Sequence, residues 1–441
     1  MLILLISLFI IKKIIIYPKQ SLKNLKKLLM EQEFQKHIKE IELKNEQFEN
    51  NTLTTKFVQK RIEEINSTFL KNNITFNESN YANFSQKEYS LEEVGKYADD
   101  FRAQNLTEIN ISNFSICSNP KISIIVPVYN LQKEILYLHK RIQEQSLKDI
   151  EIIYIDDWSN DNSYNFIKQL QKKDQRIILL KNKKNKGPFY SRNKAALFAN
   201  GEYIQFMDGD DLILENILEK IYIIAKKKNI DVVQYKAAIK YKKYTLLEEK
   251  IRNNIVYQPE LSNLLYYGKG YLVQTVFYIF NKIIKTDIYL KSMLYMGDEL
   301  LKQDLYFNED IIQLFCIFRN ANTFIFVDDI AYIKLPRLNN AKTLFNNYHN
   351  ASFANRILHD NFIEVKFLFN KTENNGRDKA ICAQFLKMVE GQYHPILRNV
   401  TEGYELFDEV YDILLNSHYF SDSQKKTFEN LKNLMMTNRN K

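Results

Sequence analysis

The chain has 441 residues, of which 45% are hydrophobic, so it can bury a sizeable core and is neither a disordered nor a fibrous protein. Its formal net charge of +9 arises from 62 basic and 53 acidic residues, and the two signs are interleaved along most of the sequence. A nucleic-acid-binding protein would gather its basic residues on one face with aromatic residues among them, so we expect no nucleic-acid partner. The three cysteines form no CxxC pair, which argues against a zinc site or a disulfide framework and leaves open one disulfide between two of them.

Residues 1–17 form an apolar N-terminal segment, MLILLISLFIIKKIIIY, which is interrupted by Lys12 and Lys13. The segment is shorter than the roughly 20 apolar residues that span a bilayer as a helix. A signal peptide, a signal anchor and a frayed hydrophobic helix are the alternatives. We favour a membrane anchor, because no small-residue cleavage site follows and Tyr17-Pro18-Lys19 has the composition of an interfacial exit.

Residues 18–118 are predicted to form a helical stem. From Ser21 to Leu70 the sequence is charged and free of glycine, and its apolar residues recur at helical spacing as far as Ile41. Because the repeat loses its register beyond Ile41, we expect a solvated spacer helix and give less weight to a coiled-coil dimer.

The second half of the stem is rich in N-x-[ST] sequons. Eight occur between residues 50 and 115, several times the number that the Asn, Ser and Thr content gives by chance. Lys12, Lys13 and Lys19 favour the opposite topology, because basic residues beside an apolar segment hold that side in the cytoplasm. We weigh the sequons more heavily and predict a single-pass membrane glycoprotein whose globular domain lies in the ER or Golgi lumen.

Residues 119–337 change to short β-branched runs that alternate with amphipathic segments. The predicted strands are Ile122 to Val126, Glu151 to Ile155, Arg176 to Leu180, Tyr203 to Met207 and Asp231 to Tyr235. The predicted helices are Gln132 to Gln145, Tyr164 to Lys173, Tyr190 to Asn200 and Leu214 to Lys227. This alternation predicts an α/β domain with a mostly parallel sheet covered by helices on both faces, in which ligands bind at the carboxyl ends of the strands.

Two of the predicted strands end in carboxylates. Asp156 and Asp157 follow one strand, and Asp208, Asp210 and Asp211 follow another. Carboxylates gathered at one sheet edge repel each other unless a cation joins them, so the pattern implies Mn2+ or Mg2+ completed by substrate phosphates and water. The alternative is an acidic turn that caps a helix beginning near Leu212.

Three motifs carry a resemblance to a known family. KISIIVPVYN (residues 121–130), EIIYIDDWSNDNS (151–163) and NKGPFYSRNKAALFANGEYIQFMDGDD (185–211) resemble the successive nucleotide-binding motifs of the family 2 glycosyltransferases, in the same order. The resemblance implies a GT-A fold and a nucleoside-diphosphate sugar donor, often UDP-linked. Two later segments, NKIIKTDIY (281–289) and AYIKLPR (331–337), resemble the family more weakly and extend the domain to residue 337.

The resemblance also assigns roles at the donor site. It implies that Pro127, Val128 and Tyr129 shape the base pocket, and that Asp157, in the pair with Asp156, hydrogen-bonds the base. Trp158 stands where the family usually has a small glycine, which puts the identity of the base in doubt.

The phosphate side of the donor site is assigned in the same way. The resemblance implies that Asp208 and Asp210 form the family's D-x-D element, which binds the ribose and, through the metal, the diphosphate. Asp211 is a third candidate ligand, and Arg192 would lie near the phosphates or the strand-end acids.

Transfer to a hydroxyl needs a base that removes its proton. In LYFNEDIIQLF (residues 305–315) the pair Glu309 and Asp310 opens an amphipathic helix and resembles the family's ED motif. The resemblance implies that Asp310 is the base and that Glu309 supports it. Two acids that are favoured in the first turn by the helix dipole are the alternative.

The remaining sequence narrows the function. Processive synthases of the family carry a Q-x-x-R-W element and several membrane helices, but the single tryptophan here is Trp158 and no later long apolar run exists. We therefore predict an inverting, metal-dependent transferase that adds one sugar to an unidentified glycan, lipid or protein acceptor. The alternative is a catalytically degenerate, membrane-tethered binding or scaffold protein. Residues 338–441 read as a helical extension without motifs.

Overall fold

The computed structural model describes residues 18–50, 53–71, 113–240, 278–335 and 351–371, together with the short pieces 93, 96, 245–247, 256–257, 425–426, 429–430 and 432–433. The predicted anchor at residues 1–17 and six of the eight sequon asparagines or their side chains lie outside this set. Within the part of the chain that is described, Asn66 and Asn113 are exposed. In the same part no helix is long and apolar enough to cross a membrane.

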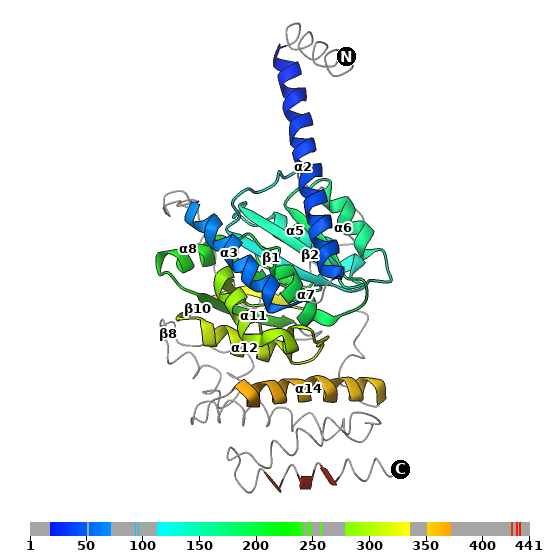
Figure 1. Ribbon diagram of the computed structural model, residues 1–441. Helices are drawn as coiled ribbons and strands as arrows, with labels where there is room; N and C mark the ends of the chain where they lie inside the picture. The colour runs from blue at the N-terminus through cyan, green and yellow to red at the C-terminus, as the bar shows by residue number, and fades with distance from the viewer. Residues whose placement is uncertain are drawn as a thin grey trace.

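A mixed sheet forms the centre of the molecule (Figure 1). One half is a parallel array in the order β3-β2-β1-β4. These strands are β1 (Ile122–Val128), β2 (Ile150–Asp156), β3 (Ile177–Lys181) and β4 (Tyr203–Phe206). They coincide with four predicted strands to within a few residues, because each is a short apolar run with β-branched side chains.

The other half of the sheet contains an insertion. Strand β9 (Lys282–Lys285) runs antiparallel between β4 and β6 (Val232–Lys240), and β10 (Thr323–Lys334) then pairs parallel with β6. Three short strands add antiparallel pairs at this end: β5 (Leu212–Ile213), β7 (Thr245–Leu247) and β8 (Val256–Tyr257). The long strands other than β9 all share one direction, so the expectation of a mostly parallel sheet is confirmed.

Helices cover both faces of the sheet. Helices α5 (Gln132–Gln143), α6 (Ser163–Gln171) and α8 (Ile217–Lys227) bury apolar residues in one core with strand residues such as Ile124 and Val126. Helices α7 (Gly187–Ala196), α11 (Thr286–Leu301) and α12 (Glu309–Asn320) form the core of the opposite face with residues such as Ile125. Alternate residues of one strand serve opposite cores, as the two-residue period of a strand requires.

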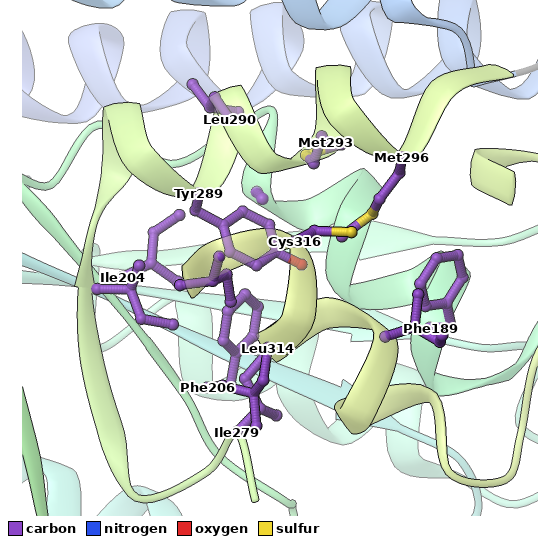
Figure 2. Packing of buried hydrophobic residues seen from close by; sticks show 14 of the residues in the cluster. Phe189, Ile204, Phe206, Ile279, Tyr289, Leu290, Met293, Met296, Leu314 and Cys316 are labelled. Carbon is purple, nitrogen blue, oxygen red and sulfur yellow. The ribbon is translucent and has the colours of Figure 1, made fainter. Parts of the chain in front are cut away.

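The second core is densely aromatic where α11 and α12 meet the sheet. In Figure 2, Tyr289 lies between Ile204 and Phe206 of β4 and the residues of α12. The rings of Phe206 and Tyr289 are 4.9 Å apart between centroids. The Tyr289 hydroxyl donates to Asn193 of α7 at 3.0 Å and accepts from Gln313 of α12 at 2.7 Å, so one side chain joins three helices and the sheet.

The stem helices exist, but the expectation of a solvated spacer is wrong, because the first buries Phe34 and Ile41 and the second packs on the domain. Helix α2 (Pro18–Asn50) is followed by α3 (Thr55–Lys71), which packs on α11 and buries Val58, Ile62 and Ile65 in the same core as α11 and α12. The apolar spacing up to Ile41 predicted the first helix, whereas this second apolar stripe carried no prediction of packing.

Polar contacts fix α3 at its N-terminus and near its middle. The Thr55 amide donates to Asp298 at 2.6 Å, and the Arg61 guanidinium donates to the Ala199 carbonyl at 2.5 Å and to Asn200 at 2.7 Å. Two of the cysteines, Cys117 and Cys316, are free thiols, and Cys382 lies outside the described residues.

Helix α14 (Ala351–Lys371) closes the other side of the α12 layer (Figure 1). Its Asp360 accepts from the Tyr306 amide at 2.9 Å, and its Asn361 accepts from the Asn308 side chain at 2.7 Å. Both contacts reach the loop immediately before Glu309, so residues beyond the predicted domain boundary hold the start of α12 in place.

Candidate active site

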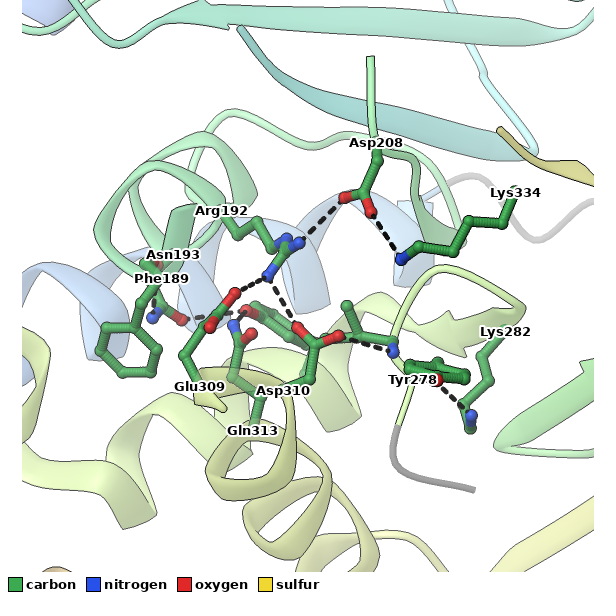
Figure 3. Close-up of polar contacts among 12 residues, drawn as sticks. Phe189, Arg192, Asn193, Asp208, Tyr278, Lys282, Glu309, Asp310, Gln313 and Lys334 are labelled. Carbon is green, nitrogen blue, oxygen red and sulfur yellow. Dashed lines mark hydrogen bonds and ion pairs between the residues drawn. The ribbon is translucent and has the colours of Figure 1, made fainter. Parts of the chain in front are cut away.

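Three of the predicted site residues meet around one arginine. Arg192 projects from α7 between the loop after β4 and the first turn of α12 (Figure 3). Its Nη1 donates to Asp310 Oδ1 at 2.7 Å and to Glu309 Oε1 at 2.8 Å, and its Nη2 donates to Asp208 Oδ1 at 3.1 Å. The guanidinium can do this because its planar fork presents several donors in fixed directions.

The three carboxylates differ in their access to solvent. The side chain of Asp208 is 28% exposed, that of Asp310 is 19% exposed and that of Glu309 is 9% exposed. Asp310 Oδ2 accepts a further hydrogen bond from the Ile279 amide at 3.3 Å. Asp208 and Asp310 are therefore the members that a ligand can reach, while Glu309 lies behind them.

Burial and mutual repulsion set the protonation of this cluster. Burial, and then the charge of Asp310, raise the pKa of Glu309 although Arg192 opposes the shift. Burial likewise raises the pKa of Asp310, and Arg192 again lowers it in part. For Arg192, burial acts to lower the pKa but is outweighed by Asp310, Glu309 and Asp208, so the guanidinium stays charged.

A second cation, Lys334 at the end of β10, faces Asp208 from the other side. Its Nζ lies 3.8 Å from Asp208 Oδ2 and 4.6 Å from the centre of the Phe280 ring. Burial acts to lower the pKa of Lys334, but Asp208 and Asp211 raise it above its ordinary value. Asp208 therefore lies between two fixed positive charges, as Figure 3 shows.

The other two acids of the D-x-D region have different surroundings. Asp210 is half-buried, whereas Asp211 is buried and accepts from the Tyr332 hydroxyl and the Leu335 amide, each at 2.8 Å. Both oxygens of Asp211 are thus used to join the loop to β10. The alternative prediction, an acidic turn that caps a helix near Leu212, is wrong. Strand β5 follows Asp211, and α8 begins only at Ile217.

Asp157 has a structural role at the start of α7. Its Oδ1 accepts from the Lys186 amide at 2.8 Å and from Asn182 Nδ2 at 2.7 Å, and its Oδ2 accepts from the Gly187 amide at 2.8 Å. A carboxylate at a helix N-terminus satisfies free amides and complements the helix dipole. Gly187 has φ +81° and its missing Cβ would meet the Leu305 carbonyl at 2.5 Å, so only glycine fits there.

Asp157 and Arg192 are therefore linked through one helix, because Asp157 caps α7 and Arg192 projects from the middle of α7. Asp156 is fully buried, and one of its oxygens has no hydrogen-bond partner. The structure leaves the predicted base-binding roles of these two aspartates as predictions.

The predicted base pocket lies at the end of β1. Val128 is buried and Pro127 is half-buried, while Tyr129 is exposed and free to meet a planar ligand. Trp158 has φ +66°, a left-handed conformation that favours glycine and costs another residue about 1–2 kcal/mol. The backbone of the DD loop, which contains Asp156, Asp157 and Trp158, thus keeps the shape that glycine would give it, with a large aromatic side chain attached.

Two features of the site were not anticipated. Lys334 lies within the segment AYIKLPR, whose weak resemblance gave no role to any residue. The buried face of α14, with Asp360 and Asn361, carries no motif at all. The only sequence feature that could have indicated a site role for Lys334 is its position at the end of an apolar run.

The family resemblance implies a divalent metal beside these acids. Among the described residues no three His, Cys, Asp or Glu side chains converge to form a metal site. Asp208 and Asp210 are accessible carboxylates at one loop, and Mg2+ or Mn2+ in such sites takes one or two carboxylates and fills its other positions with phosphates and water. The residues therefore fit a metal that arrives with a diphosphate, with Asp208 and Asp210 as its protein ligands.

Comparisons with known proteins agree with this geometry. Residues 123–287 match the model of Glycosyl transferase family 2. Glycosyltransferase GlyG of Streptococcus pneumoniae serotype 4 is 36% identical over 112 residues, which are 25% of this chain and 37% of that protein. The cholesterol galactosyltransferase of Borreliella burgdorferi is 28% identical over 265 residues, which are 58% of this chain and 70% of that protein.

A structural likeness supports the same fold. The crystal structure of S. aureus TarS 1–349 in complex with UDP-GlcNAc has a TM-score of 0.51 at 17% identity, and the match covers 73% of this chain and 92% of that chain. The likeness shows the fold alone.

The sheet and its helices form a GT-A-like fold. The chain carries a match to the family 2 glycosyltransferase domain at residues 123–287, which is less than half of its length. It spans less than half the length of the first curated relatives that it matches, 37% for GlyG.

Proposed function

We propose that the protein transfers one sugar from a nucleoside-diphosphate sugar, UDP-linked, to an acceptor hydroxyl, with inversion and with Mn2+ or Mg2+. The observation that carries the proposal is the bridge from Arg192 to both Asp208 and Asp310, which brings the donor-side acid and the candidate base to one point. TarS, a protein of similar fold, has been crystallised with UDP and with UDP-GlcNAc, which supports a UDP-linked donor. The acceptor class stays open among glycans, lipids and proteins.

Asp310 is the proposed base. In the reaction an acceptor oxygen forms a bond to the anomeric carbon while the bond from that carbon to the diphosphate oxygen breaks on the opposite face. The acceptor proton passes to Asp310, and the nucleoside diphosphate leaves with the electron pair. Burial raises the pKa of Asp310, which makes its carboxylate a stronger base than an exposed aspartate, while Arg192 offsets part of the rise.

The cations of the site serve the leaving group. Arg192 and Lys334 place two positive charges beside Asp208, at the loop where the diphosphate is expected, and they attract the negative charge that develops there. A metal held by Asp208 and Asp210 would supply further neutralisation of the diphosphate charge. Glu309 holds Arg192 from behind and fixes its direction.

The test is the release of UDP from a panel of UDP-sugars by the purified full chain, with hydrolysis measured first and candidate acceptors added afterwards. Turnover that requires Mn2+ or Mg2+ supports the proposal. Binding of UDP without any turnover, over the whole panel of sugars and acceptors, would instead support the degenerate binding or scaffold protein.

We also propose that residues 1–17 anchor the protein to a membrane with the catalytic domain in the ER or Golgi lumen. The support is the apolar N-terminal segment and the eight sequons. Extraction of membranes with alkaline carbonate should leave the full chain in the pellet and release a chain that lacks residues 1–17. Resistance of the protein to an endoglycosidase would contradict the luminal topology.

A further inference from the structure

A cavity of about 250 Å³ lies beside the DD loop, where α2 crosses the edge of the sheet. One wall is α2, with Ile38, Ile41 and Asn45, and the other comes from Trp158, from α6 and from the end of β3. The family match begins at residue 123, so the α2 wall comes from outside the shared domain. The volume is near the lower end of small-molecule pockets, which hold about 300–1,000 Å³, and suits a ligand of one or two rings.

The aromatic side of the cavity is built from Trp158 and Tyr164. Trp158 is 47% exposed and occupies a backbone conformation that disfavours it. A residue kept in a strained conformation while its large apolar ring stays in solvent is a candidate for a binding role. Lys181 Nζ lies 4.5 Å from the centre of the Tyr164 ring and 5.5 Å from that of Trp158, so it closes one end of the aromatic pair.

Asn45, which lines the cavity, carries an unsatisfied acceptor. Asn45 donates from Nδ2 to the Lys181 carbonyl at 3.3 Å, but its Oδ1 is buried without any hydrogen-bond partner. A buried polar atom without a partner is unfavourable, and a ligand hydroxyl or amide would satisfy it.

The charges around the cavity favour a neutral ligand. The lining contains charges of both signs: Glu42 and Glu46 of α2, and Lys168, Lys181 and Lys183. A charged ligand of either sign would therefore lie near like charges. A ring with hydroxyl or amide donors, an apolar face and no net charge combines all of these requirements.

We propose that this cavity binds a neutral sugar ring, with the ring face on Trp158 and a hydroxyl or N-acetyl amide donating to Asn45 Oδ1. The choice of a sugar rests on the proposed function, since an acceptor saccharide supplies such a ring. The site also approaches the donor side: Asn182 lines the cavity and donates to Asp157 Oδ1 at 2.7 Å, so an occupant would contact the partner of the residue that caps α7.

The experiment uses the fact that Trp158 is the single tryptophan of the chain, so tryptophan fluorescence reports on the surroundings of this one residue. The full chain is titrated with glucose, galactose, N-acetylglucosamine, N-acetylgalactosamine, lactose and maltose, and separately with UDP and UDP-sugars. At least one free saccharide is expected to change the emission saturably, both in the wild type and in the variant with Asp208→Ala and Asp210→Ala. If no free saccharide changes it, the proposal fails.

The remaining arms identify the source of any signal. A change seen only with UDP or UDP-sugars, and lost in the double variant, would mean that Trp158 contacts the donor and would overturn the proposal of a separate sugar site. A response to free saccharides without any UDP binding would leave this site standing while the proposed transferase function fails.

Two substitutions test the named contacts. Asn45→Ala should weaken saccharide binding about tenfold, the loss expected for one hydrogen bond of about 1.4 kcal/mol, while the exposed neighbour Lys44→Ala should leave it unchanged. Trp158→Gly should fold, because glycine accepts φ +66°, and should lose saccharide binding in a saturation-transfer NMR experiment. Binding that survives both Asn45→Ala and Trp158→Gly would contradict the assignment.

Discussion

Arg192 donates a hydrogen bond to Asp310 at 2.7 Å although 118 positions separate the two residues in the chain. The same guanidinium reaches Asp208 at the end of β4, so one side chain fixes the distance between the donor-side acid and the candidate base. Because α7 carries Arg192 and is capped by Asp157, the orientation of the cluster depends on the DD loop as well.

Asp310→Asn should leave nucleotide binding intact and reduce transfer by about 10²–10⁴-fold, because a general base contributes about that much and an amide cannot accept the proton. The rate of UDP release measures transfer, and a UDP-induced rise of the unfolding midpoint measures binding. Asp287→Asn, which removes a half-buried carboxylate of α11 that pairs with Lys291, is the matched control and should change neither. Transfer at the wild-type rate in Asp310→Asn would remove the assignment of the base.

Lys334→Met should raise KM for the donor about tenfold, because it removes the positive charge 3.8 Å from Asp208 Oδ2 while keeping a side chain of similar length. Steady-state kinetics over a range of UDP-sugar concentrations separate KM from kcat. Lys220→Met breaks the pair with Asp329 on the same strand, away from the acid cluster, and should leave KM unchanged. Equal KM values for wild type and Lys334→Met would show that this lysine does not serve the donor.

The stability of the protein should depend on pH through Glu309. Burial, and then Asp310, raise the pKa of Glu309 from 4.5 to about 8 in the folded protein, so the folded state keeps a proton that the unfolded chain loses in this range. The contribution is fully present below 4.5 and is lost as the pH rises through about 8. Glu309→Gln stays neutral and should therefore gain stability relative to wild type between about pH 5 and about pH 9.

Urea denaturation of wild type and Glu309→Gln at several pH values measures this difference. If the free energies of unfolding of the two proteins differ by the same amount at every pH, the pKa of Glu309 is not raised in the folded protein.

The sequence predicted the parallel half of the domain well, because each strand there is a short apolar run and the acids follow directly after Ile155 and Met207. It did not predict β9, because Lys282–Lys285 has lysines at both ends and only two apolar residues between them. It also gave no role to Lys334, since the approach of β10 to Asp208 depends on strand order, which local patterns do not encode.

The family resemblance assigned Asp208 to the donor site and the pair Glu309 and Asp310 to catalysis. It placed Arg192 only near the phosphates or the strand-end acids, and did not predict that Arg192 joins the three carboxylates. Arg192 could equally have paired on the surface, because a single arginine in a helix carries no signal of burial. The same limit applies to Asp157, whose capping of α7 depends on a loop 29 positions later in the chain.

The docking of α3 can be tested by truncating its buried face. Ile65→Ala should lower the free energy of unfolding by about 2–5 kcal/mol, because the side chain is buried in the core shared with α11. Leu43→Ala on the exposed side of α2 is the control and should change stability by no more than about 0.5 kcal/mol. If Ile65→Ala unfolds at the wild-type midpoint, α3 does not pack on the domain and is a solvated spacer.

The most direct test of the donor site is thermal unfolding of the full chain with a panel of nucleoside diphosphates, each with and without Mn2+. A ligand that binds the folded state at about 100 times its Kd adds about 2.7 kcal/mol of stability. We predict that UDP with Mn2+ raises the midpoint, that UDP without metal has a smaller effect, and that Asp208→Ala combined with Asp210→Ala abolishes the metal-dependent part. A midpoint that no nucleotide changes, with or without Mn2+, would contradict a donor site at these residues.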